Sequence, residues 1–118
     1  MAYFPMFVDI EKKKCLIVGG GTVALRKVQV LLDFGADVVV VAPEVIPKIK
    51  EYPVTVYQRN FQKTDLQGCE LVVAATDDAG LNHEIAEAAQ KQKIPVNAVD
   101  QQEDCRYSGD SYFWHSGT

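Results

Sequence analysis

The fold is decided by the stretch CLIVGGGTVALRK at residues 15–27. Its first four residues form a continuous apolar run, which is typical of a strand buried on both faces of a parallel sheet. Three glycines end that run, and apolar residues then recur from Ala24 at the spacing of one helix face. The stretch therefore predicts a strand, a tight turn and a helix, in that order.

The glycine turn predicts a binding site for the phosphates of a dinucleotide, because the pattern Gly19-x-Gly21-x-x-Ala24 lies between a predicted strand and a predicted helix. Gly19 permits the tight turn, Gly21 lets a pyrophosphate approach the backbone, and the small Ala24 lets the helix pack closely on the strand. Unpaired amides at the helix start favour negative charge. The alternative is a glycine turn used only for packing. The predicted phosphate-binding residues are Gly19, Gly20, Gly21, Thr22 and Val23.

The rest of the chain alternates strands with helices. Further strands are predicted at residues 37–41, 54–57, 70–75 and 95–99. Gly35 ends the first helix, Pro47 fixes the first turn of a short second one, and Leu81 and Ile85 lie on one face of a third. Crossovers of this length predict an α/β fold, a Rossmann-type doubly wound parallel sheet of about five strands with flanking helices.

One domain is expected over residues 1–105, beginning with a short extended lead-in at residues 4–8. Residues 106–118 mix tyrosine, serine, glycine and tryptophan without periodicity, and we expect them to form a loose tail. The chain has 118 residues and is 47% hydrophobic, which is enough for one core.

Composition excludes several classes of protein. The 12 basic and 16 acidic residues are scattered, so no basic face for nucleic acid is expected. The apolar runs are far shorter than the roughly 20 residues of a membrane span, and no signal peptide is expected at the amino terminus. Cys15, Cys69 and Cys105 are too far apart in sequence for a typical zinc site or disulfide framework. We expect a cytoplasmic protein without a metal.

Carboxylates follow three of the predicted strands, at the sheet edge where ligands bind in such folds. After the second strand the chain reads Ala42-Pro43-Glu44, where a nicotinamide-binding unit usually has an acid for a ribose hydroxyl. No arginine lies beside Glu44 to bind the extra phosphate of NADP, so NAD is expected over NADP.

Asp77 and Asp78 follow the fourth strand and Asp100 the fifth. For Asp77, Asp78 and the nearby Asn82, the simplest role is to cap the third helix. Lining of the cleft is the alternative for the two aspartates. Asp100 is either an ordinary turn residue or a general base in the crevice. His83 and His115 are expected to be surface residues rather than ligands.

These segments, taken in order, resemble the amino-terminal domain of the siroheme-synthase family of precorrin-2 dehydrogenases. The resemblance spans roughly residues 3 to 105. It includes the opening Phe4-Pro5-Met6-Phe7 and the stretch at residues 15–27. It continues through Gly35-Ala36, residues 40–44, residues 74–78, Leu81-Asn82 and residues 94–100.

The resemblance implies NAD-dependent oxidation of precorrin-2, a tetrapyrrole, to sirohydrochlorin. It implies cofactor contacts at Thr22, Val23, Pro43 and Glu44, and a catalytic carboxylate at Asp100. Thr76 and Asp77 complete the expected cofactor site. Family members are homodimers, and some also insert ferrous iron into sirohydrochlorin.

The chain departs from the family pattern after Cys105, where members continue into an apolar strand and a dimerisation region. Here residues 106–109 read RYSG instead. Two alternatives therefore stand beside the dehydrogenase: a nucleotide-sensing Rossmann module without catalysis, and a truncated, silent fragment that keeps the fold.

Overall fold

The computed structural model describes residues 9–99 and 112–115. The predicted lead-in at residues 4–8 and the candidate catalytic residue Asp100 lie outside these ranges. In chain order the elements are β1 (Lys14–Val18), α1 (Thr22–Asp33), β2 (Asp37–Val41), α2 (Pro47–Lys50), β3 (Thr55–Tyr57), the 3-10 turn η1 (Lys63–Leu66), β4 (Leu71–Ala74), α3 (Ala79–Lys91), β5 (Val96–Val99) and β6 (Tyr112–His115).

The strands form one sheet in the order β3-β2-β1-β4-β5-β6. The first five are parallel, as predicted, and β1 lies at the centre between β2 and β4. The chain builds outward from β1 to β3 and then returns to place β4 on the other side of β1. The strand order therefore reverses between β1 and β4, which is where doubly wound sheets bind ligands.

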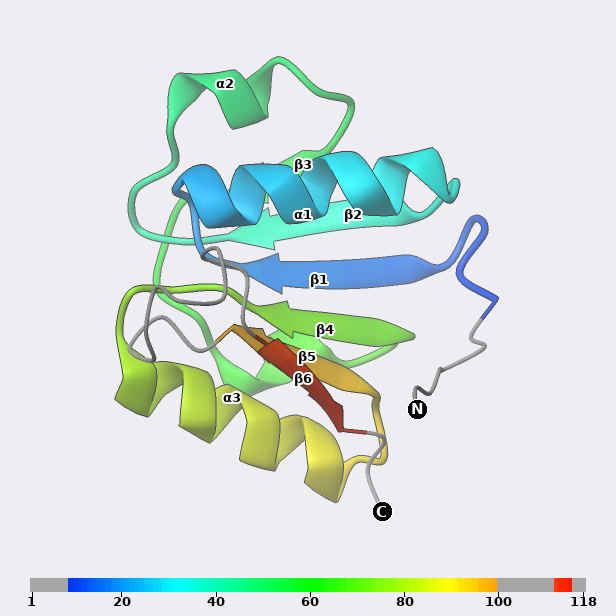
Figure 1. Ribbon diagram of the computed structural model, residues 1–118, viewed down its shortest axis with the longest axis vertical. Coiled ribbons are helices and arrows are strands. Elements are labelled where there is room, and N and C mark those ends of the chain that lie inside the picture. The colour runs from blue at the N-terminus through cyan, green and yellow to red at the C-terminus, as the bar shows by residue number, and fades with distance from the viewer. Residues whose placement is uncertain (1–8, 100–111, 116–118) are drawn as a thin grey trace.

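Helices cover both faces of this sheet (Figure 1). Helices α1 and α2 pack on one face, where their residues Ala24, Val28 and Ile49 join a cluster with Ile17 of β1. Helix α3 packs on the other face, where Ile85 and Ala89 join Leu16 of the same strand. Because consecutive residues of β1 point to opposite faces and both faces are covered, the apolar run at residues 15–18 is buried throughout.

Helix α1 begins and ends where the glycines predict. Gly21 precedes its first residue in an extended conformation. At the other end Gly35 has a φ of +78° and its amide donates to the Leu32 carbonyl at 2.9 Å. A left-handed residue at this position is the usual device for ending a helix, and glycine adopts it without the strain of a Cβ.

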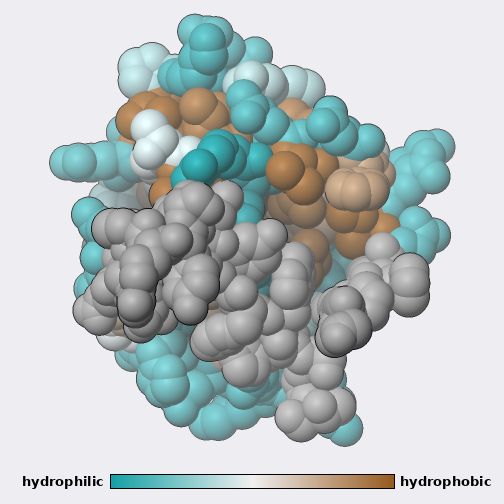
Figure 2. Space-filling model, in the orientation of Figure 1, coloured by the Kyte–Doolittle hydropathy of each residue, from teal (hydrophilic) through white to brown (hydrophobic). Residues whose placement is uncertain are grey.

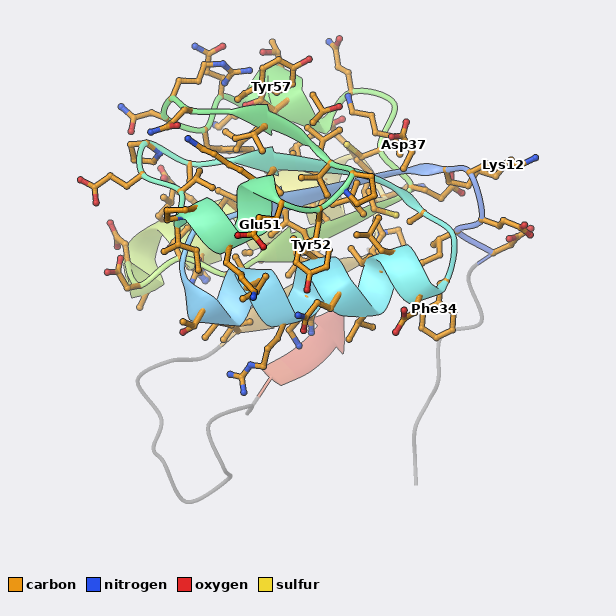
Figure 3. All side chains as sticks on the ribbon, turned by 90° about the horizontal axis from the view of Figure 1, so that it is seen from above. Lys12, Phe34, Asp37, Glu51, Tyr52 and Tyr57 are labelled. Carbon is orange, nitrogen blue, oxygen red and sulfur yellow. The ribbon has the colours of Figure 1, made fainter. Side chains whose placement is uncertain are left out.

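The short helix α2 lies beside α1 (Figure 3). Pro47 occupies its first turn, as the sequence predicts. Tyr52, just beyond its end, accepts a 2.8 Å hydrogen bond on its hydroxyl from the Gln29 amide of α1. The outer side of α1 also carries Val30, 49% exposed, and Phe34 follows it at 64%. Figure 2 shows apolar residues on this face.

The tail prediction is wrong at residues 112–115. These residues form strand β6, which pairs antiparallel with β5 from Val99↔Tyr112 to Val96↔His115 (Figure 1). The free edge of β5 supplies a row of amides and carbonyls that a further strand can satisfy. The aromatic run of residues 112–114 has high strand propensity, which outweighs the missing alternation. Residues 106–111 lie outside the described ranges.

No helix in the described part of the chain is both long and apolar enough to cross a membrane.

Two buried polar side chains, one on β5 and one on the neighbouring helix α3, differ in their hydrogen bonding. Asn82 is 5% exposed and is hydrogen-bonded to Thr76 and Val99. Asn97 is 1% exposed, and its side-chain nitrogen and oxygen have no hydrogen-bond partner among the described residues. A buried polar group without a partner costs about 1–3 kcal/mol.

We therefore expect Asn97→Val to raise the free energy of unfolding by about 1–2 kcal/mol, because the change removes two unpaired atoms and adds a residue suited to strands. Urea unfolding followed by circular dichroism measures the change. The matched control is Asn82→Val, which removes satisfied hydrogen bonds and is expected to lower stability. If Asn97→Val destabilises the chain as much as the control does, the prediction is wrong.

Candidate functional site

A cavity of about 800 Å³ opens at the carboxyl edge of the sheet, at the point where the strand order reverses. Its walls come from the segments that follow β1, β2 and β4, with Asn60 added from the segment after β3. Four crossovers of the fold thus bring together residues that are up to about sixty positions apart in the sequence. All nine predicted cofactor residues line this cavity: Gly19, Gly20, Gly21, Thr22, Val23, Pro43, Glu44, Thr76 and Asp77.

The three glycines differ in what surrounds them. Gly19 has a φ of +137°, and a Cβ added there would lie 2.8 Å from the carbonyl carbon of Ala75 and closer still to its oxygen. A Cβ at Gly20 would meet the Glu44 carbonyl oxygen and lie 2.8 Å from the Val45 Cα. A Cβ at Gly21 would meet no atom within 4 Å. Gly19 and Gly20 are therefore required by the protein's own packing, whereas Gly21 faces open space that a ligand could fill.

The start of α1 contributes backbone amides to the cavity. Thr22 and Val23 form its first turn and line the cavity, and among the described residues no side chain caps this helix end. By contrast, α3 begins at a capped position, where the Asp78 carboxylate accepts a 3.1 Å hydrogen bond from the Leu81 amide. An uncapped helix start in a cavity suits an anionic group such as a pyrophosphate.

The segment after β2 forms a second wall. Pro43 and Glu44 are both exposed and line the cavity, as the sequence predicts. The amide of Ile46 donates to the Gly20 carbonyl at 2.9 Å, which joins this segment to the glycine turn. The described residues that line the cavity include three carboxylates, Glu44, Asp77 and Asp78, and neither arginine nor lysine.

The segment after β4 forms the third wall and corrects one prediction. Asp78 is the residue that caps α3, so the capping role predicted for this region falls to it, while Asp77 is exposed and lines the cavity. Asn82 is not a cap. It lies inside α3, and its side chain instead binds Thr76, through whose hydroxyl it receives a 2.7 Å hydrogen bond.

Asn60 is a cavity residue that the sequence reasoning missed. It follows β3, and the guanidinium of the adjacent Arg59 donates to its carbonyl at 3.1 Å. The same guanidinium binds both oxygens of Asp65, at 2.7 and 3.0 Å. These hydrogen bonds from Arg59 lower the pKa of the Asp65 carboxyl. The only sign of Asn60 in the sequence was its position after a predicted strand, because residues that follow parallel strands lie at the same carboxyl edge of the sheet.

His83 is a surface residue, as predicted, and lies 3.2 Å from Glu87 on the exposed side of α3. The side chain of His115 and the whole of Asp100 fall outside what the structure describes.

Comparisons with known proteins agree with this geometry. Residues 6–108 match a family model described as "Putative NAD(P)-binding". The chain belongs to this family. The match covers all of the cavity-lining segments, so an NAD(P)-binding role is the family's expectation for this site.

The chain is also similar to siroheme synthases, as its motifs predict. It is 42% identical to that of Nitrosococcus oceani and 46% identical to that of Pseudomonas entomophila, over 104 residues in each case. Each comparison covers 85% of this chain and 22% of the relative, so the chain spans about a fifth of these curated relatives. Among solved structures it resembles "SirC, precorrin-2 dehydrogenase", with a TM-score of 0.65 and 31% identity over 71% of this chain and 44% of that one.

The contrast between the glycines predicts different outcomes for two alanine substitutions. Gly20→Ala drives a Cβ into backbone atoms of the β2–α2 segment, so we expect it to lower the free energy of unfolding by about 2 kcal/mol or more. Gly21→Ala meets open space and has an extended backbone, so its effect on stability is expected to stay within about 1 kcal/mol.

If Gly21 faces the phosphates, Gly21→Ala instead weakens NAD binding by about tenfold or more. Thermal unfolding and calorimetric titration with NAD measure the two effects separately. Equal losses of stability in the two variants would contradict the packing account.

Proposed function

We propose that this chain is the dinucleotide-binding unit of a precorrin-2 dehydrogenase, which oxidises precorrin-2 to sirohydrochlorin with NAD. The observation that carries the proposal is the cavity at the reversal of strand order, lined by all nine residues predicted to hold the cofactor. The similarity to siroheme synthases and to SirC supports the choice of reaction.

Each wall of the cavity has a part in holding the dinucleotide. The amides at Gly21, Thr22 and Val23 bind the pyrophosphate at the positive end of α1. Pro43 and Glu44 would hold the adenine ribose, and the Glu44 carboxylate would accept hydrogen bonds from its hydroxyls. Thr76 and Asp77 form the wall after β4 and would complete the binding of the dinucleotide.

The charges of the described cavity residues favour NAD over NADP. The extra phosphate of NADP is usually bound by arginine, and neither arginine nor lysine is among those residues. Glu44 adds a negative charge near the expected position of that phosphate. From the described residues of the cavity a 2′-phosphate therefore meets repulsion, and none of them supplies a compensating cation.

Oxidation of precorrin-2 removes a hydride and a proton from the reduced tetrapyrrole. When bound, the nicotinamide supplies the acceptor for the hydride. The chain supplies the acceptor for the proton, and Asp100 is the proposed general base, since it follows the last residue of β5 at the sheet edge that carries the cavity. Thr76 and Asp77 lie at the same edge, after the adjacent strand β4.

Partners and location belong to the same proposal. The family's homodimeric assembly offers a second subunit whose bases could bind the carboxylates of the tetrapyrrole, because this chain is net acidic at −4. A reducing compartment such as the cytoplasm is consistent with Cys15 and Cys69, which are buried and free. Burial raises the pKa of the Cys15 thiol to about 12, so it stays protonated.

Calorimetric titration of the chain with NAD and with NADP, followed by assay of sirohydrochlorin formation from precorrin-2, tests the proposal. We expect NAD to bind at least about tenfold more tightly than NADP, by the charge argument above. Failure of NAD to bind would overturn the assignment of the cavity. Binding without sirohydrochlorin or NADH would instead favour the nucleotide-binding module without catalysis.

Asp100→Asn is expected to reduce turnover by about 10²–10⁴-fold while the dissociation constant for NAD stays within about threefold of the unaltered chain. The reason is that asparagine keeps the shape of the side chain but cannot accept the proton. Absorbance of sirohydrochlorin measures turnover, and calorimetry measures NAD binding. Glu87→Gln, an exposed carboxylate of α3 remote from the cavity residues, is the control. Unchanged turnover in Asp100→Asn would remove Asp100 from the mechanism.

A further inference from the structure

We propose that Asn82 is a positioning residue that ties the segment after β4 to the end of β5 and so fixes the Val99 carbonyl, whose peptide group is shared with Asp100. The inference rests on the proposed function, because it concerns the geometry between the cofactor cavity and the proposed catalytic carboxylate. From its place in the sequence, Asn82 was expected only to cap α3.

A single buried amide makes four hydrogen bonds at this place. The Asn82 oxygen accepts from the Thr76 backbone amide at 3.0 Å and from the Thr76 hydroxyl at 2.7 Å. Its nitrogen donates to the Thr76 carbonyl at 2.9 Å and to the Val99 carbonyl at 3.3 Å. An asparagine side chain has two donors and two acceptor sites, so its full capacity is used.

These bonds lie where the sheet stops holding the two strands together. The pairing of β4 with β5 ends at Ala74↔Ala98, and Thr76 and Val99 lie beyond that last pair. Asn82 binds both the amide and the carbonyl of Thr76, as a neighbouring strand would, and reaches across to Val99. The Asn82 side chain therefore takes the place of the backbone hydrogen bonds between β4 and β5 for one further residue at the carboxyl edge of the sheet.

The side-chain amide of Asn82 is held in place by helix α3, which packs against the sheet. Asn82 lies in the first turn and a half of α3, where its backbone amide donates to the Asp78 carbonyl at 3.0 Å. The next turns of the helix, through Ile85, Ala86 and Ala89, are packed in the core cluster against the sheet. A side chain held by a docked helix loses little further entropy when it bonds, so it can fix two loops relative to each other.

The two segments that Asn82 joins, at Thr76 and at Val99, are next to the cofactor cavity and to the proposed general base. Thr76 lines the cofactor cavity, and its hydroxyl also accepts from the Asp78 amide at 3.1 Å, which shapes the turn that carries Asp77. Val99 immediately precedes Asp100 in the chain. Loss of the Asn82 bonds would let the peptide that joins Val99 to Asp100 move relative to the cavity wall, although neither Asn82 nor its bonds touch substrate.

The experiment compares the chain with Asn82→Asp, Asn82→Val and the control His83→Ala. Asn82→Asp keeps the two acceptor positions and loses both donors, including the one to Val99. Asn82→Val loses all four bonds. His83 is the next residue on the same helix but is exposed, so its replacement leaves the tie intact.

The first readout is the amide nitrogen resonance of Asp100 in the labelled chain without ligand, because this nitrogen shares a peptide group with the Val99 carbonyl. We expect it to move or broaden in both Asn82 variants and to stay in place in His83→Ala. An Asp100 resonance that is unchanged in a folded Asn82→Asp protein overturns the proposal, whether or not the chain binds NAD. If Asn82→Val does not fold, Asn82→Asp decides.

The second readout is the division of the effect between binding and turnover. We expect the NAD dissociation constant of Asn82→Asp to stay within about threefold and kcat at saturating NAD to fall by at least about tenfold. A merely structural role would raise the apparent NAD dissociation constant and lower the turnover rate together, as the unfolded fraction grows, and that result overturns the positioning role. Absence of NAD binding or turnover in the unaltered chain instead contradicts the proposed function. In that case the Asp100 amide resonance alone tests whether Asn82 fixes the Val99 carbonyl.

Discussion

The structure depends on a backbone contact among three strand ends that no side chain interrupts. Gly19 donates to the Val41 carbonyl of β2 at 3.0 Å, and Ala75, which follows β4, donates to the Val18 carbonyl of β1 at 2.8 Å. The glycine turn sits between these neighbours so closely that a Cβ at Gly19 or Gly20 would meet a carbonyl group. The central strand, the start of α1 and two walls of the cavity are all positioned by this contact.

The same contact explains why the cavity can hold an anion although its described walls carry carboxylates. With no side chains at the turn, the backbone at Gly21 is open and the first amides of α1 have no side-chain cap among the described residues. Among the described cavity residues, positive potential is thus supplied by the peptide dipoles of a helix and by neither lysine nor arginine. The carboxylates lie on the other walls, after β2 and β4, where hydroxyl groups of a ribose suit them better than phosphate does.

Buried polar groups concentrate on β5 and its neighbours, and their satisfaction differs sharply. Asn82 uses its whole hydrogen-bonding capacity to join two segments, whereas Asn97 finds no partner within the described residues. A buried network stabilises only when it is complete, so the first side chain adds rigidity and the second subtracts stability. Asn97 lies on the strand that precedes the proposed catalytic residue and Asn82 is bonded to the last residue of that strand, so function, rather than stability, is expected to set both residue types.

The sequence by itself determined the parallel sheet, the helices and nine of the cavity residues, because periodicity, glycine positions, strand ends and the order of the motifs can all be read along the chain. Residues 15–27 and 37–41 behaved as their patterns predict. Only the tertiary structure decided what depends on neighbours distant in the chain: that Gly20 is required by Glu44, that Asn60 enters the cavity, that Asn82 reaches Val99 instead of capping its helix, and that residues 112–115 form a strand on the edge of β5. Hydrogen bonds and close contacts between segments depend on their positions in space, which local sequence patterns do not encode.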